Sequence, residues 1–341
     1  MDKLVSIWSK DQSLPENYIF PPENRPGKFV DVPPSDTIPV IDLSKTVDNR
    51  NDTIQQILQT SKEFGFFQVI NHGVSEKLIN DSMSMFEELH GMSVEDKASL
   101  FSENESKSCR LYTGALNYDS EDIHYWRENL KHPCYPLQES MQHWPQKPTR
   151  YREVVGKYSV EVNKLGSVIL ELICEGLGLE AGYLGDDKLS GSALMSVNHY
   201  PPCPNPSLTL GLLKHCDPNL ITILLQGDVS GLQVFKDGQW ISVHPLPSAF
   251  VVNLGLVLHI ISNDKLKSVK HRAVTNSKKA RTSAAIFITP TSDSILEPAK
   301  ALIDASNPQI YKAFEYKDFL NNYIIMADNP EKSLQPYKLK A

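Results

Sequence analysis

The chain has 341 residues, 40% of them hydrophobic and 22% charged, a composition that excludes a disordered, collagen-like or low-complexity protein. Its 34 Lys and Arg residues against 41 Asp and Glu residues give a net charge of −7. No basic cluster offers the positive surface that a nucleic-acid backbone requires, so nucleic-acid binding is set aside.

The cysteines and the N-terminal residues indicate an intracellular protein. The five cysteines are odd in number, widely spaced and without a CxxC motif, which favours reduced thiols over disulfides or a zinc site. Residues 1–20 lack the apolar segment of a secretory signal, and the apolar run at 249–261 is too short to span a bilayer. We therefore expect a cytoplasmic monomer without membrane contact.

In chain order, the first half of the sequence predicts mainly helices. Residues 1–38 are rich in proline and are expected to form an extended arm. The spacing of apolar residues predicts two helices and then a long one. These helices span 52–64, 76–92 and 149–175, and short strands are expected at 38–43 and 66–70.

From about residue 191 the pattern changes to short β-segments separated by turns. An Asp237-Gly238 pair predicts a hairpin turn in this region. The segments lie at 194–200, 220–226, 232–235, 240–243, 249–254, 273–275 and 282–289. Regular short strands of this kind are typical of a sandwich or barrel, so we predict a helical first half wrapped around a β-barrel.

Three polar side chains beside these β-segments predict a metal centre. His215 and Asp217 are two residues apart on extended chain, so their side chains point the same way, and His271 follows later. Two histidines and one carboxylate form the facial triad of non-haem Fe(II) oxygenases. Zinc more often uses a closed tetrahedral set or an HExxH helix, and neither is present.

Arg281 and Ser283 predict the anchor of a 2-oxo acid. Activation of O₂ by Fe(II) requires two further electrons, and oxidative decarboxylation of a 2-oxo acid bound to the iron supplies them. The distal carboxylate of such an acid needs a permanently charged, bidentate partner, which an arginine provides. Ser283 lies two residues from Arg281 and adds a neutral donor on the same face.

With these residues in place, the sequence resembles the plant 2-oxoglutarate/Fe(II)-dependent dioxygenases over residues 38–311. The motifs that carry the resemblance are FGFFQVINHG at 64–73, NHYPPCP at 198–204, His215-x-Asp217 with His271, and Arg281-x-Ser283. The resemblance implies Fe(II) as cofactor, 2-oxoglutarate and O₂ as cosubstrates, and ascorbate as reductant. It also implies that Asn198 and Tyr200 bind 2-oxoglutarate.

The resemblance further implies an α+β fold with a double-stranded β-helix (jelly-roll) core and the helical N-terminal half packed around it. The expected divisions are a mostly helical region with its Pro-rich arm at 1–190, the β-helix core at 191–295, and a C-terminal helical segment at 296–341 that closes the site. Strand alternation places Ser196 beside Asn198, and Phe287 on the face of Arg281, so both are candidates for the substrate pocket. Phe287 is equally compatible with a plain core position.

Within this family the closest resemblance is to the hyoscyamine 6β-hydroxylases. In those enzymes a Leu-Tyr pair is followed two residues later by a glutamate that holds the protonated tropane nitrogen. Here Tyr112 is retained, but Gly114 stands at the glutamate position. Asp119, Glu121 or Asp122 could replace that carboxylate, or could simply form a solvated acidic loop.

These observations predict a dioxygenase that hydroxylates, or epoxidises, a small plant specialised metabolite. A tropane alkaloid such as hyoscyamine is the first expected substrate. The alternative is a phenolic, flavonoid or hormone-like acid, which the loss of the glutamate favours. A catalytically silent binding barrel is the non-enzyme alternative, and the complete set of triad residues argues against it.

Overall fold

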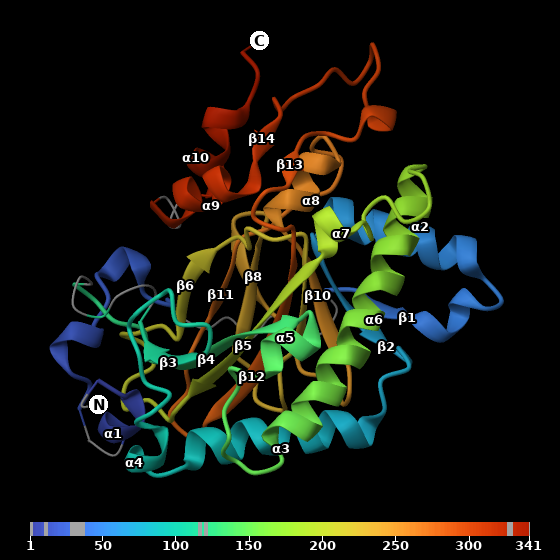
Figure 1. The fold of residues 1–341 in the computed structure, drawn as a ribbon. Helices are drawn as coiled ribbons and strands as arrows, with labels where there is room; N and C mark the ends of the chain where they lie inside the picture. Colours follow the sequence, from blue (N-terminus) through green and yellow to red (C-terminus); the bar gives the residue numbers. More distant parts are fainter. Residues whose placement is uncertain are drawn as a thin grey trace.

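The computed structural model describes residues 3–9, 13–27, 38–114, 118, 122–325 and 330–340 (Figure 1). The helices in these ranges are α1 (Val5–Trp8), α2 (Arg50–Glu63), α3 (Glu76–Gly91), α4 (Val94–Lys97), α5 (Leu137–Met141), α6 (Tyr151–Leu177), α7 (Asp187–Ser190), α8 (Leu256–Ile261), α9 (Tyr316–Ile325) and α10 (Pro330–Leu334). The strands are β1 (Val40–Asp42), β2 (Phe66–Ile70), β3 (Arg110–Thr113), β4 (Glu128–Tyr135), β5 (Ser192–Tyr200), β6 (Leu212–His215), β7 (Ile221–Leu225), β8 (Leu232–Lys236), β9 (Gln239–Ser242), β10 (Phe250–Leu254), β11 (His271–Ala273), β12 (Arg281–Thr289), β13 (Ile295–Leu296) and β14 (Phe314–Glu315).

Two sheets form the core of the described chain. Eight strands make the large sheet in the order β1-β2-β10-β7-β12-β5-β4-β3, and four make the small sheet in the order β6-β11-β8-β9. β1 and β2 run parallel, and the other neighbours in the large sheet run antiparallel. One cavity is lined by residues of both sheets. This is the predicted jelly-roll, with helices packed outside it.

Alternation along the strands separates a core face from a cavity face. On the outer face of the large sheet, Val197, Ala284 and Ile286 are buried in the main hydrophobic cluster. Helices α3 and α6 cover this outer face (Figure 1). Residues in between, such as Asn198 and Ser283, line the cavity between the sheets. The polar residues of β5 and β12 therefore lie inside the barrel.

Several local predictions agree with the structure. The long helix α6 carries apolar residues at helical spacing and ends at Gly178, whose φ of 69° is the left-handed conformation that glycine adopts without strain. The hairpin between β8 and β9 turns at Asp237 and Gly238, both with positive φ. Part of the predicted Pro-rich arm, residues 28–37, lies outside the described residues.

The N-terminal half contributes more than helices. Four strands of the large sheet, β1 to β4, precede residue 191, and the sequence analysis did not predict β3 or β4. Both strands lack the apolar alternation of a half-buried strand, because their buried outer positions include the polar residues Thr113, Glu128 and His132. Pro133 also argued against a strand at β4, since proline is rare inside strands.

The outer face of β4 holds the N-terminal helix α1. Glu128 is fully buried there and accepts hydrogen bonds from the Ser6 main-chain N–H at 2.7 Å and from Lys97 Nζ at 3.5 Å. Burial alone would raise the pKa of Glu128, but His90 and Lys97 outweigh it and lower the pKa to about 2.

Among the described residues, no helix is long and apolar enough to cross a membrane.

Candidate active site

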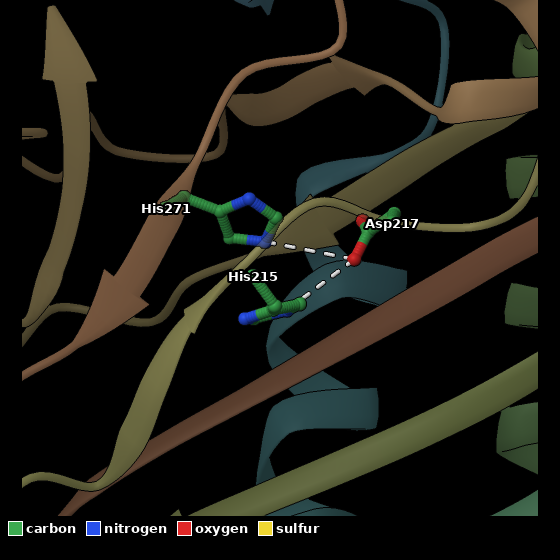
Figure 2. Close-up of side chains that lie close together, drawn as sticks. All are labelled: His215, Asp217 and His271. Carbon is green, nitrogen blue, oxygen red and sulfur yellow. Dashed lines mark ion pairs between the residues drawn. The ribbon is translucent and has the colours of Figure 1, made fainter. Parts of the chain in front are cut away.

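The side chains of His215, Asp217 and His271 converge at the cavity, where β6 ends and β11 begins (Figure 2). Asp217 Oδ1 lies 3.4 Å from His215 Nε2 and 3.6 Å from His271 Nε2. One ligand atom from each residue lies within 4.8 Å of the other two. The two strands pair antiparallel with His271 directly opposite His215, and this register brings the imidazoles side by side.

Each imidazole is oriented by a main-chain carbonyl. His215 Nδ1 donates to the carbonyl of Leu213 at 2.9 Å, and His271 Nδ1 donates to that of Val269 at 3.3 Å. The hydrogen bond fixes the tautomer and leaves the Nε2 lone pair free, as in most histidines that bind a metal. Burial, with His215 nearby, lowers the pKa of His271 to about 4, so this ring is neutral at pH 7.

The Asp217 carboxylate is held by one oxygen and presents the other. Oδ2 accepts hydrogen bonds from Thr222 Oγ1 at 2.6 Å and from Asn253 Nδ2 at 2.7 Å, so Oδ1 faces the two histidines. Burial would raise the pKa of Asp217, but His271 and His215 outweigh it, and the net pKa lies well below the usual value. The residue is therefore a carboxylate despite being only 3% exposed.

These donor atoms fit Fe(II). Two imidazole nitrogens and one carboxylate oxygen meet beside the cavity, which is the 2-His-1-carboxylate arrangement of non-haem iron sites. The hydrogen bonds to Nδ1 and Oδ2 are the outer contacts that orient such ligands. In the described part of the chain, no other group of His, Cys, Asp or Glu residues comes together in this way.

A buried cation faces the triad from the large sheet. Arg281 is 3% exposed, and its guanidinium donates to the Val229 carbonyl at 3.1 Å and to Ser283 Oγ at 3.3 Å. None of the carboxylates in the described ranges forms an ion pair with Arg281. The pairing of β12 with β5 places Arg281 opposite Tyr200 and Ser283 opposite Asn198.

One cavity is lined by the three triad residues and by the four residues predicted to bind 2-oxoglutarate, Arg281, Ser283, Tyr200 and Asn198. A buried guanidinium without an anionic partner is unfavourable, and a carboxylate ligand would balance it. The distal carboxylate of 2-oxoglutarate has this chemistry. The residues present therefore fit the cosubstrate as well as the metal.

The predicted substrate-pocket residues divide into two groups. Phe287 lines the cavity with the triad. Ser196, Tyr112 and Gly114 lie further along the same face, on or beside β5 and β3. Ser196 Oγ accepts a hydrogen bond from Asn129, and the Gly114 carbonyl accepts one from Arg127 at 2.7 Å.

Of the three acidic residues that could replace the missing glutamate, the structure describes only Asp122. Asp119 and Glu121 lie outside the described residues, and Asp122 is exposed. The group that contacts Gly114 is instead a cation, Arg127, which is 6% exposed. Among the described residues, the charged group at Gly114 is therefore a cation and not a carboxylate.

Four contributing residues were not singled out from the sequence. Thr222 and Asn253 are polar residues inside otherwise apolar strands that the sequence did predict, and this break in pattern was an available signal. Asn129 and Arg127 belong to β4 and the residue before it, which the apolar pattern did not reveal. Both contact Asn198, with Arg127 donating to Oδ1 at 3.0 Å and Asn129 at 2.6 Å.

Comparison with known proteins agrees with this geometry. Residues 191–290 match the 2OG-Fe(II) oxygenase superfamily, and residues 38–151 match the N-terminal region of the non-haem dioxygenases in morphine synthesis. Hyoscyamine 6-dioxygenase of Hyoscyamus niger is 42% identical over 99% of both chains. The chain belongs to the 2OG-Fe(II) oxygenase superfamily.

Other members show the range of this superfamily. The 2'-deoxymugineic-acid 2'-dioxygenase of Hordeum vulgare is 41% identical over 96% of this chain and 94% of its own. Flavanone 3-dioxygenase 2 of Oryza sativa subsp. japonica is 41% identical over 91% of this chain and 90% of its own. The crystal structure of JOX2 with 2OG, Fe and JA superposes with a TM-score of 0.85 at 31% identity, covering 98% of this chain and 97% of that one. The predicted family, jelly-roll fold, dioxygenase activity, Fe(II) and 2-oxoglutarate are thereby confirmed.

Proposed function

We propose that His215, Asp217 and His271 hold the catalytic Fe(II) and that Arg281, Ser283, Tyr200 and Asn198 bind 2-oxoglutarate. The observation that carries this assignment is the single cavity that joins the three ligand side chains to a buried arginine without an anion. When bound, Fe(II) supplies the site at which O₂ is reduced as 2-oxoglutarate is decarboxylated to succinate, with one oxygen atom passing to a substrate C–H bond.

The protein side chains position the reactants and exclude water. Arg281 and Ser283 orient the distal carboxylate of 2-oxoglutarate. The carbonyl oxygen of Asn198 accepts from Arg127 and Asn129, so its amide nitrogen, which donates to Ser196 Oγ at 3.5 Å, is the group that can donate a second hydrogen bond to 2-oxoglutarate. Phe66, which packs edge-on against His271 with ring centroids 5.1 Å apart, is one of the apolar walls that keep water away.

Two substrate classes follow from the sequence. A tropane alkaloid such as hyoscyamine is supported by the similarity to hyoscyamine 6-dioxygenase. A phenolic, flavonoid or hormone-like acid is supported by the similarity to enzymes acting on flavanones and on deoxymugineic acid. We favour the acid class, because Arg127 contacts Gly114 at the position where the alkaloid enzymes carry a glutamate.

The location and assembly of the protein are also proposals. None of the five buried cysteines forms a disulfide, which supports a reducing compartment such as the cytoplasm. We further propose that the chain acts as a monomer on a small-molecule substrate.

The assignment is tested by removing one ligand at a time. His215→Ala, Asp217→Ala and His271→Ala should each abolish succinate formation and weaken Fe(II) binding, because two ligands no longer provide the facial set. Circular dichroism should show that each variant is folded. Normal turnover in any one variant would remove that residue from the metal site. A screen of candidate substrates by succinate release and product mass then identifies the reaction.

A further inference from the structure

Three cationic side chains share one face of the β3–β4 strand pair. Arg110 lies directly opposite Lys131, and Tyr112 lies opposite Asn129. Directly opposite residues of an antiparallel pair point to the same side. Arg127 precedes Asn129 by two residues and joins the same side through its bonds to Gly114 and Asn198. We call Arg110, Arg127 and Lys131 the cationic face.

This face is continuous with the proposed 2-oxoglutarate site. In the pairing of β4 with β5, Asn129 is opposite Asn198 and Lys131 is opposite Ser196. In the pairing of β5 with β12, Asn198 is opposite Ser283. Hydrogen bonds from Asn129 to Ser196 at 2.5 Å and to Asn198 at 2.6 Å connect the strands on this side. The cationic face therefore lies on the same side of the large sheet as Asn198 and Ser283, one strand pair away from them.

The positive charge of this face has no counterion among the residues that the structure describes. Arg110 and Arg127 are 5% and 6% exposed, and Lys131 is half-buried. Within the described ranges, no carboxylate forms an ion pair with any of the three. Arg110 Nη1 and Arg127 Nε are buried and have no hydrogen-bond partner among those residues.

The nearest acid in the sequence does not neutralise this face. Glu128 alternates to the other side of β4, where Ser6 and Lys97 satisfy it. The Arg110 guanidinium instead stacks on the Tyr112 ring, 4.0 Å from its centroid. Like charges directly opposite each other destabilise a strand pair, and an unpaired buried charge is costly. A ligand that supplies negative charge would remove both costs.

We propose that the substrate carries a carboxylate and that the cationic face binds it. This inference rests on the proposed function, because the cationic face can bind a substrate only if the neighbouring residues hold iron and 2-oxoglutarate. A protonated amine would be repelled at the same place. The alternative is that these side chains are structural and that Arg127 serves only to orient Asn198.

Binding to the complete enzyme separates these possibilities. Wild-type protein with Fe(II) and 2-oxoglutarate is titrated without oxygen, and the visible absorption of the Fe(II)–2-oxoglutarate complex reports substrate binding. The probes are coumaric acid, indole-3-acetic acid and 2'-deoxymugineic acid, each paired with its methyl ester, and hyoscyamine as the amine. We expect at least one acid to bind about ten-fold or more tightly than its ester, as loss of a charge-assisted bond predicts.

Two variants then locate the charge that recognises the acid. Arg110→Met and Lys131→Met keep the aliphatic stem and remove the cation, and Arg127 is left intact because it also holds Asn198. Each variant should weaken binding of the preferred acid about ten-fold while leaving its ester and 2-oxoglutarate unchanged. Lys62→Met, which removes an exposed cation on α2, is the matched control and should change neither.

A measurement without substrate adds an independent readout. If the cationic face binds a ligand and does not stabilise the fold, Arg110→Met and Lys131→Met should each have a melting temperature equal to or higher than that of the wild type, because repulsion between the opposed charges is relieved. A structural role predicts a lower melting temperature in both.

The inference is overturned if no acid is preferred over its ester, if hyoscyamine binds best, or if the variants weaken acid and ester equally. Absence of the 2-oxoglutarate-dependent absorption in the wild type would instead overturn the proposed function, and this inference with it. A normal absorption without discrimination between acid and ester overturns the inference alone.

Discussion

Replacing Thr222 by Val tests how the Asp217 carboxylate is aimed. The Thr222 hydroxyl donates to Asp217 Oδ2 at 2.6 Å, and both groups are buried. A hydrogen bond to a charged group contributes about 1.5–3 kcal/mol, and each 1.4 kcal/mol corresponds to about ten-fold in binding. Because Asn253 still holds the same oxygen at 2.7 Å, we expect the lower end of this range. Affinity for Fe(II) should therefore fall about ten-fold, within the range typical of outer contacts to metal ligands.

The assay is an anaerobic titration with Fe(II) at saturating 2-oxoglutarate, followed by the absorption of the complex. Valine matches threonine in shape, so the strand is expected to stay folded, and a melting curve checks this. Thr282→Val is the matched control, because it removes a hydroxyl bonded to His199 Nδ1 at 3.0 Å on the helix-facing side of the neighbouring strand. Wild-type Fe(II) affinity in Thr222→Val would show that the hydroxyl does not position Asp217.

Three further predictions address the cosubstrate, pH and the C-terminal helix. Arg281→Lys should raise the KM for 2-oxoglutarate about ten-fold in steady-state assays, because a point charge replaces a bidentate fork; an unchanged KM would indicate another anchor. Burial lowers the pKa of His132 from 6.5 to about 4, so the contribution of this residue to the unfolding free energy should be constant above pH 6.5 and fall by about 3 kcal/mol as the pH drops to 4, because the unfolded state binds the proton more readily. Urea denaturation at a series of pH values measures the unfolding free energy, and His132→Gln should remove this part of its pH dependence. Tyr323→Phe removes a hydrogen bond of 2.6 Å to the Cys216 carbonyl between two triad residues, and should lower kcat while the KM for 2-oxoglutarate stays constant.

Periodic patterns in the sequence predicted those parts of the fold in which burial is regular. α6 has one apolar face, and β5, β7, β10 and β12 alternate or are wholly buried, so their residues show the pattern that local rules detect. β3 and β4 were not predicted because polar residues, among them Glu128 and His132, also occupy their buried outer face. The pattern was absent where buried positions hold polar side chains whose partners come from other elements, as Glu128 and His132 do.

The residues of the site also fall into a group that was predicted from the sequence and a group that was not. His215, Asp217, His271 and Arg281 were predicted because a metal and a 2-oxo acid demand particular side chains at short spacings. Their outer partners were not, because which residue faces Asp217 depends on the register of strands distant in sequence. The cationic face has the same origin, since it exists only when β3, β4 and β5 lie side by side. Pairings of that kind are set by the fold as a whole.

The contact between α1 and Glu128 depends on the presence of the N-terminal residues but not on the identity of residue 6. Ser6 donates through its main-chain N–H, so any residue except proline at this position keeps the bond. A protein shortened to begin at residue 13 would lose the donor and leave a buried carboxylate with fewer partners on the back of β4. Because the opposite side of β4 carries Asn129 and Lys131, such trimming should disturb catalysis from a distance. Expression designs that keep residues 3–9 avoid this effect.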